Sequence, residues 1–192
     1  MGSEFELKYK ATPEIQEEIS WDFGSFAAIS METTYYDTKD RILLQQKVTL
    51  RRRLENGISI CTVKTPEIGG ARGDWEVEAV EIEAGLEKLC KLDCSVDLRA
   101  LRKAGVEPLC GARFIRRVAI VNLPECTAEL ALDFGVLTGG GKEIPLCEVE
   151  LELKSGSREA LVVYGNEFSA RYGLEKEPVS KFRRAMALTV GE

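Results

Sequence analysis

The 192-residue chain contains no histidine. This absence excludes nucleophilic catalysis by Ser–His or Cys–His pairs, because the imidazole base is missing. The six cysteines include no CxxC pair, so a zinc site has little support, and reduced thiols in the core are the expected state. Any chemistry must therefore rest on carboxylates, Lys, Arg and metal ions.

Long apolar runs are also missing. No run approaches the length of a membrane-spanning helix, and no charged-then-apolar leader precedes a cleavage site. We therefore expect no membrane association and a cytoplasmic location. The net charge of −6 argues against a general nucleic-acid binder, yet it is compatible with a local basic pocket for a small anion. A hydrophobic content of 44% with 30% charged residues predicts one globular domain over residues 1–192, and the sequence assigns no oligomeric state.

The first residues show a pattern that recurs later in the chain. In a strand, Glu4, Glu6 and Lys8 share one face, whereas Phe5 and Leu7 share the other. The apolar face is available for packing. The charged face suits either open water or a bound ionic ligand.

Other stretches repeat this alternation or show helical spacing. Strands are expected at residues 3–10, 30–37, 46–54, 58–64, 74–80, 112–121, 126–134 and 144–154. Helices are expected at residues 12–20, 82–104 with a break near Cys94, and 157–172.

The dipeptide Asn56-Gly57 predicts a hairpin between the third and fourth strands. Arg51 and Arg53 share one face of the first arm, and Lys64 lies on one face of the second. An alternative interpretation of these arginines is a solvated surface patch or a nucleic-acid contact.

The run Gly139-Gly140-Gly141-Lys142 has a superficial likeness to a phosphate-binding loop. That loop requires Ser or Thr and then a helix after its lysine, whereas here Glu143 and a strand follow. A hairpin turn is the prediction.

The polar faces of the expected strands sort by the sign of their charge. Acids lie on the first, fifth and eighth strands, and bases lie on the third, fourth and sixth. Hairpin connections predict an antiparallel sheet, and the helices need the apolar strand faces as a packing surface. With the charged faces turned inward, this predicts an α+β fold: an eight-stranded closed antiparallel β-barrel with a charged lumen and helices packed outside. Acids facing bases suit a polyanion bound with Mg²⁺ or Mn²⁺.

Several short motifs occur in a fixed order along the chain. They are Glu4-x-Glu6-x-Lys8, Tyr35-Tyr36-Asp37-Thr38, Leu50-Arg51-Arg52-Arg53, Thr62-Val63-Lys64, Asp133-x-Gly135, Glu148-x-Glu150-x-Glu152 and Ser180-Lys181. In this order they resemble the motifs of the CYTH domain family, the triphosphate tunnel metalloenzymes, whose ExExK signature alone is a weak signal. Together they extend over nearly the whole chain.

The resemblance implies a tunnel that binds triphosphate groups with a divalent metal, and it implies roles by position. The residues implied to hold phosphate are Lys8, Arg51, Arg53, Lys64, Arg116, Lys181 and Arg184. Those implied to hold Mg²⁺ or Mn²⁺ are Glu4, Glu6, Asp133, Glu148 and Glu150, with Glu76, Glu78 and Glu152 as second-rank candidates. Glu4, Glu6 and Lys8 are the implied catalytic residues. The alternative for each charge is a structural ion pair.

The resemblance is strongest to the bacterial inorganic triphosphatases. It implies hydrolysis of inorganic tripolyphosphate, a small-molecule partner, to pyrophosphate and phosphate. Class IV adenylate cyclase and thiamine triphosphatase are the alternative enzymes. A polyphosphate-binding or nucleotide-binding module is the alternative without catalysis.

Overall fold

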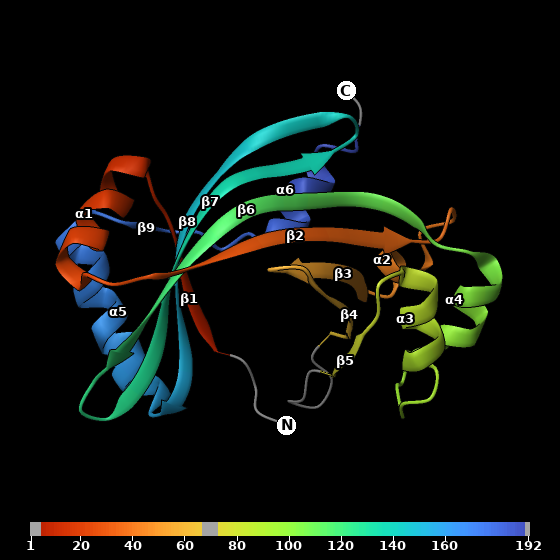
Figure 1. Ribbon diagram of the computed structural model, residues 1–192, viewed down its shortest axis with the longest axis horizontal. Helices are drawn as coiled ribbons and strands as arrows, with labels where there is room; N and C mark the ends of the chain where they lie inside the picture. The colour runs from red at the N-terminus through yellow and green to blue at the C-terminus, as the bar shows by residue number, and fades with distance from the viewer. Residues whose placement is uncertain (1–4, 67–72, 191–192) are drawn as a thin grey trace. The chain divides into compact units, whose positions relative to one another are not determined.

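The computed structural model describes residues 5–66 and 73–190 (Figure 1). In chain order, its elements are β1 (Glu6–Lys10), α1 (Pro13–Phe23), β2 (Ala27–Asp37), α2 (Ile42–Gln45), β3 (Thr49–Glu55), β4 (Ile58–Lys64), β5 (Asp74–Glu78), α3 (Ile82–Leu89), α4 (Leu98–Ala104), β6 (Glu107–Asn122), β7 (Cys126–Gly139), β8 (Lys142–Gly156), α5 (Arg158–Tyr172), β9 (Glu175–Lys176) and α6 (Lys181–Ala187).

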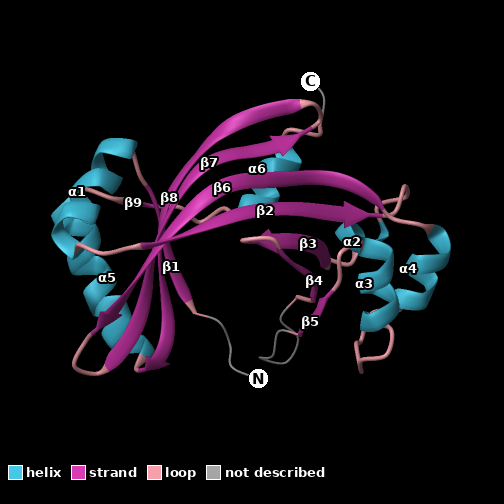
Figure 2. Ribbon diagram, in the orientation of Figure 1, coloured by secondary structure: helices cyan, strands magenta, loops and turns pink. Residues whose placement is uncertain are grey.

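The strands form one nine-stranded sheet in the order β5-β4-β3-β2-β6-β7-β8-β1-β9 (Figure 2). The predicted α+β class and antiparallel pairing are present, but the predicted eight-stranded closed barrel is wrong. Among the described residues, β5 and β9 each have a single neighbour, so the sheet is open. The two-residue β9 pairs with Tyr9 and Lys10 and thereby occupies the outer edge of β1. So short a strand has no alternation that a sequence pattern can reveal.

The hairpin between β3 and β4 has the predicted turn. Asn56 and Gly57 have φ values of 48° and 89°, and Glu55 lies opposite Ile58. Positive φ at both central residues is the geometry that Asn-Gly favours, because its twist matches that of the flanking strands. The turn therefore aligns β3 with β4 and sets which residues face each other.

The chain forms two compact units, which we describe separately. Of the described residues, the first contains 5–29, 114–136 and 144–180, and the second contains 30–66, 73–113, 137–143 and 181–190. The single-domain expectation stays a prediction.

In the first unit, helices α1 and α5 cover the apolar face of β1, β7 and β8. Ile19 of α1 and Phe168 of α5 pack in one cluster with Tyr9, Leu130 and Val149 from these strands. The alternation of side chains thus directs the apolar face toward the helices, as expected. The charged residues of the same strands consequently lie on the opposite face.

In the second unit, α3 and α4 cover an equivalent apolar face of β3 and β4. Leu50 and Val63 pack with Leu86 of α3 and Leu98 of α4. The backbone of α3 lies close to β4. A Cβ atom added at Gly85 of α3 would be 2.5 Å from the Sγ atom of Cys61 on β4.

All six cysteines are free thiols, and Cys61, Cys110 and Cys126 are buried. Burial raises the pKa of the Cys110 thiol from 9.0 to about 12. Within the described part of the chain, no helix is both long and apolar enough to cross a membrane.

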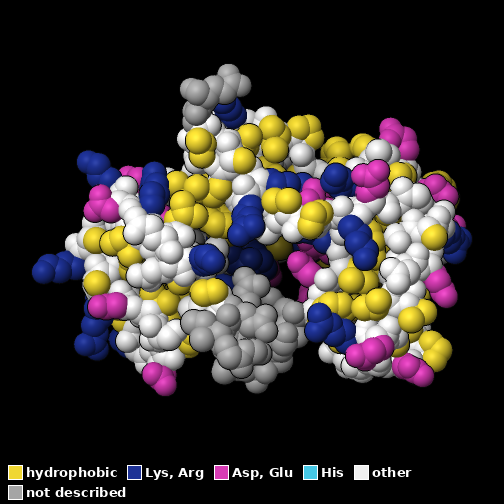
Figure 3. Space-filling model, turned by 180° about the vertical axis from the view of Figure 1, so that it is seen from behind, with side chains coloured by type: hydrophobic (Ala, Val, Ile, Leu, Met, Phe, Trp, Pro, Cys, Tyr) yellow, Lys and Arg dark blue, Asp and Glu magenta, His cyan; other side chains and the backbone are white. Residues whose placement is uncertain are grey.

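Acidic and basic side chains lie next to one another on the face shown in Figure 3. Ion pairs between exposed side chains include Arg41–Glu107 at 3.0 Å and Arg102–Glu87 at 3.2 Å. Exposed pairs of this kind contribute little to stability, because water and salt screen them.

Candidate metal and phosphate site

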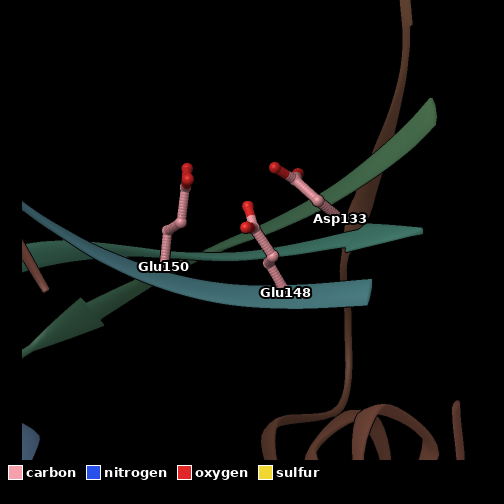
Figure 4. Close-up of side chains that lie close together, drawn as sticks. All are labelled: Asp133, Glu148 and Glu150. Carbon is pink, nitrogen blue, oxygen red and sulfur yellow. The ribbon is translucent and has the colours of Figure 1, made fainter. Parts of the chain in front are cut away.

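Three buried carboxylates lie together in the first unit. Asp133 is on β7, and Glu148 and Glu150 are on the adjacent β8. One ligand atom of each lies within 4.8 Å of the others, and their exposed fractions are 0%, 0% and 6%. Figure 4 shows the three carboxyl groups on the same side of the strands. The neighbouring Leu132 and Val149 belong to the apolar core, so alternation along the strands separates the acids from the leucines and valines.

Arg116, on β6, contacts two of these acids. Its Nε and Nη2 atoms donate to Oδ1 and Oδ2 of Asp133 at 2.8 and 2.7 Å, and Nη2 also donates to Glu150 Oε2 at 2.5 Å. Burial would lower the pKa of Arg116, but hydrogen bonds and charge from the two carboxylates raise it overall. Arg116 therefore lies with the acids, although the resemblance implied a role in holding phosphate.

The donor set fits a divalent cation. Asp133, Glu148 and Glu150 each offer a carboxylate oxygen, and these oxygens lie within 4.8 Å of one another. Buried carboxylate oxygens are the ligands that Mg²⁺ and Mn²⁺ prefer.

The opening strand runs beside the acidic cluster. In the antiparallel register of β1 and β8, Lys8 lies opposite Glu150, and Glu6 lies opposite Glu152. Directly opposed side chains on one face of a sheet are near neighbours. Glu6 is exposed and is outside the three-carboxylate cluster, and Glu4 lies outside the described residues.

The second unit carries the predicted bases of β3 and β4 on one face. Arg51 lies opposite Thr62, and Thr49 lies opposite Lys64. Arg53, two residues after Arg51, has the same orientation by alternation. The intervening Arg52 belongs to the other face and donates from Nη1 to the carbonyl of Val80 at 2.9 Å. The structure thus separates Arg52 from the predicted phosphate-binding arginines.

Arg51 and Arg53 are incompletely paired. Among the described residues, the buried Nε atoms of Arg51, Arg52 and Arg53 all lack a hydrogen-bond partner. Arg51 Nη2 lies 3.9 Å from Glu76 Oε1, and Arg53 Nη1 lies 2.9 Å from Glu55 Oε1. Burial, and next the like charge of Arg53, lower the pKa of Arg51. An anion that accepts these N–H groups would relieve both effects.

The acids of β5 lie beside these bases. The Lys64 Nζ atom is 2.7 Å from Asp74 Oδ2, and Thr62 Oγ1 donates to Glu76 Oε1 at 3.0 Å. Glu76 was predicted as a second-rank metal ligand, whereas Asp74 was not among the predicted site residues. Its spacing of two residues from Glu76 was the signal that both acids share one strand face.

The other second-rank acids have separate surroundings. The Lys154 Nζ atom lies 3.1 Å from Glu152 Oε1, and Glu78 is exposed. The carbonyl of Glu78 accepts a hydrogen bond from Lys88 Nζ at 2.7 Å.

Helix α6 carries Lys181 and Arg184 and packs against two features of the second unit. The rings of Phe182 and Tyr35 are 4.8 Å apart between centroids. A Cβ added at Gly139 would lie 2.4 Å from the carbonyl oxygen of Ala185, so the β7–β8 hairpin touches the backbone of α6. The glycine run that has a likeness to a phosphate-binding loop is therefore a hairpin turn that supports α6.

Asp37 of the Tyr-Tyr-Asp-Thr element has a structural role. Its carboxylate is 1% exposed and accepts backbone N–H bonds from Thr38, Leu43 and Leu44 at 2.7, 2.9 and 3.0 Å. These bonds satisfy donors at the start of α2, where the helix leaves N–H groups unpaired.

Comparisons with known proteins agree on one family. The sequence profile of the CYTH domain matches residues 2–186. An inorganic triphosphatase of Haemophilus influenzae is 27% identical over 195 residues, which cover 98% of this chain and 55% of that protein. The chain thus spans about half the length of this curated relative.

Solved structures show the same fold. A candidate adenylate cyclase of Bacillus halodurans has a TM-score of 0.63 at 21% identity, covering 94% of this chain and 96% of that one. A candidate adenylyl cyclase of Hippeastrum with a dominant triphosphatase activity has a TM-score of 0.67 at 18% identity, and the match covers 98% of this chain and 97% of that one.

Proposed function

The chain belongs to the CYTH domain family, and on this premise we propose that it is a divalent-metal-dependent hydrolase of triphosphates. Its substrate is inorganic tripolyphosphate, and its products are pyrophosphate and phosphate. The observation that carries the proposal is the buried cluster of three carboxylates on β7 and β8, which offer one ligand atom each within 4.8 Å of one another. The relative that is named an inorganic triphosphatase supports the choice of substrate.

Asp133, Glu148 and Glu150 would hold Mg²⁺ or Mn²⁺, together with Glu4 and Glu6 of the ExExK motif. A cation held there supplies charge neutralisation for phosphoryl oxygens and lowers the pKa of a bound water. Burial strengthens the attraction between these carboxylates and a cation, because the surroundings screen charge less than water does.

The phosphate oxygens would accept hydrogen bonds from Arg51, Arg53 and Lys64. The position of these bases on one face of β3 and β4 supports this role, because an anion on that face can accept from the N–H groups of both arginines. The remaining bases that would hold the substrate are Lys8, Lys181 and Arg184, whereas Arg116 would reach a phosphate only by leaving Asp133 and Glu150.

In the reaction, a water oxygen forms a bond to the terminal phosphorus, and the bond from that phosphorus to the bridging oxygen breaks. Pyrophosphate leaves with the electron pair, and the attacking water releases one proton to the solvent. Glu6, next to Lys8 on the charged face of β1, orients the water. The bases stabilise the charge on the equatorial oxygens, which is a preorganised electrostatic effect.

The test measures phosphate and pyrophosphate release from tripolyphosphate, ATP and thiamine triphosphate with Mg²⁺, with Mn²⁺ and with EDTA. Asp133→Asn should lower turnover of tripolyphosphate by at least about 100-fold, because it removes a ligand charge. The matched control is Glu129→Gln on the same strand, whose carboxylate lies 3.5 Å from Lys154 Nζ. This control should keep wild-type turnover.

The other outcomes would replace the proposal. Pyrophosphate and cyclic AMP from ATP would assign a class IV adenylate cyclase, and preferential hydrolysis of thiamine triphosphate would assign that substrate. Tight binding of tripolyphosphate without turnover would overturn the enzymatic function and leave a binding module.

A further inference from the structure

A buried amide joins the two strands that carry the carboxylate cluster. Gln16 of α1 is 1% exposed, and its Nε2 atom donates to the carbonyl oxygens of Asp133 at 3.0 Å and Glu148 at 2.9 Å. These two acids contribute to the cluster from β7 and β8. One side chain thus holds the backbone at two of the three candidate metal ligands.

The two hydrogen bonds matter because of where their acceptors lie. Both acceptors are backbone carbonyls of fully buried residues, and a buried carbonyl without a donor is costly. Loss of the amide would favour movement of β7 or β8 toward another donor. Such movement changes the separation of the Asp133 and Glu148 carboxylates, which a cation requires to be short and constant.

Helix α1, which carries Gln16, is capped at its start and hydrogen-bonded to α5 at its end. At its start, Thr12 Oγ1 accepts from the N–H of Ile15 at 3.4 Å. At its end, Asp22 Oδ2 accepts from Tyr172 Oη and from Arg171 Nη2 of α5, each at 2.7 Å. These last two bonds fix the end of α1 against α5.

We infer that Gln16 is a positioning residue for the metal site, acting through the backbone of Asp133 and Glu148. The inference rests on the proposed function only for the identity of the site as a divalent-metal site. Gln16 touches neither the cation nor the substrate. Its loss should therefore weaken binding of the cation and leave the bases of β3 and β4 unchanged.

The test is direct titration of the full chain with Mn²⁺, in which electron paramagnetic resonance measures the free ion without any substrate. Gln16→Met has a similar volume but no donor, and it should weaken Mn²⁺ binding by about 10-fold or more. Gln16→Asn keeps an amide on a shorter side chain and should give a smaller loss. The KM for tripolyphosphate at saturating Mn²⁺ should stay at the wild-type value.

The matched control is Tyr9→Phe. It removes another buried hydrogen bond of the first unit, from Tyr9 Oη to the carbonyl of Gly165 at 2.9 Å, without touching the cluster. This variant should lose thermal stability and bind Mn²⁺ as the wild type does. This control therefore distinguishes a loss of Mn²⁺ affinity caused by general destabilisation from one caused by displaced metal ligands.

Three results would overturn the inference. They are wild-type Mn²⁺ affinity in both Gln16 variants, an equal loss of affinity in Tyr9→Phe, and an increase in KM as large as the loss of Mn²⁺ affinity. Failure of Gln16→Met to fold leaves Gln16→Asn to decide, by the same titration. A wild-type chain that binds no Mn²⁺ would instead refute the metal site of the proposed function.

Discussion

Arg116 and Asp133 form a two-point contact, in which Nε donates to Oδ1 at 2.8 Å and Nη2 donates to Oδ2 at 2.7 Å. The Asp133 side chain is 0% exposed and that of Arg116 is 16% exposed. A buried pair of this kind loses much when one partner is removed, because the other charge remains without compensation. Arg116 therefore stabilises the acidic cluster when no cation is bound.

We predict that Arg116→Ala lowers the free energy of unfolding in EDTA by about 3 kcal/mol. Mn²⁺ should recover part of this loss, because the cation replaces the missing positive charge. Urea denaturation with and without Mn²⁺ measures both values. The control Arg117→Ala removes a more exposed ion pair, to Glu17 at 3.4 Å, and should change stability little. An equal loss for Arg116→Ala in EDTA and in Mn²⁺ would contradict the prediction.

Adjacent arginines of β3 should differ in their effect on substrate binding. We predict that Arg51→Ala raises the KM for tripolyphosphate by about 10- to 100-fold, because hydrogen bonds to a charged group are lost. Arg52→Ala should leave KM unchanged, since Arg52 lies on the other face and bonds the Val80 carbonyl. Steady-state kinetics at saturating Mg²⁺ test the pair. Equal KM values in the two variants would show that the strand faces do not separate these roles.

The Cys110 thiol should make stability depend on alkaline pH. Burial raises its pKa from 9.0 to about 12, so the folded chain retains a proton that the unfolded chain loses. The stability that comes from the neutral thiol is present below pH 9.0 and is lost as the pH rises toward about 12. Urea denaturation over this range should show a smaller decline for Cys110→Ala than for the wild type. Parallel declines would exclude Cys110 as the cause.

Alternation along the strands was sufficient to predict which of the candidate side chains share a strand face. It separated Arg51 from Arg52, and it directed Asp133 and Glu148 away from the apolar core. The hairpin at Asn56-Gly57 was also predictable, because that dipeptide accepts the required positive φ values. These features were predictable because each depends only on residues that are close together in the sequence.

Features that depend on distant contacts were not predictable in this way. The two-residue β9 leaves too short a pattern, yet it occupies the edge of β1 and leaves the sheet open. The pairing of Arg116 with acids depends on the register between β6, β7 and β8, which alternation within a single strand does not specify. Gln16 left a faint signal, because it precedes the buried Ile19 by three residues on the inner face of α1. A buried amide in a helix does not by itself identify its acceptors.

Gly139 should affect binding of the substrate through α6. An added Cβ would lie 2.4 Å from the Ala185 carbonyl oxygen, so the hairpin or the helix must shift. We predict that Gly139→Ala raises the KM for tripolyphosphate several-fold, because Lys181 moves with the helix, and that it leaves Mn²⁺ affinity unchanged. The control is Gly141→Ala in the same turn, where an added Cβ meets nothing within 4 Å but φ is +74°. That variant should lose about 1–2 kcal/mol of stability at an unchanged KM, since an L-residue is strained there. Equal KM values in the two variants would mean that the position of α6 does not control binding, whatever the loss of stability.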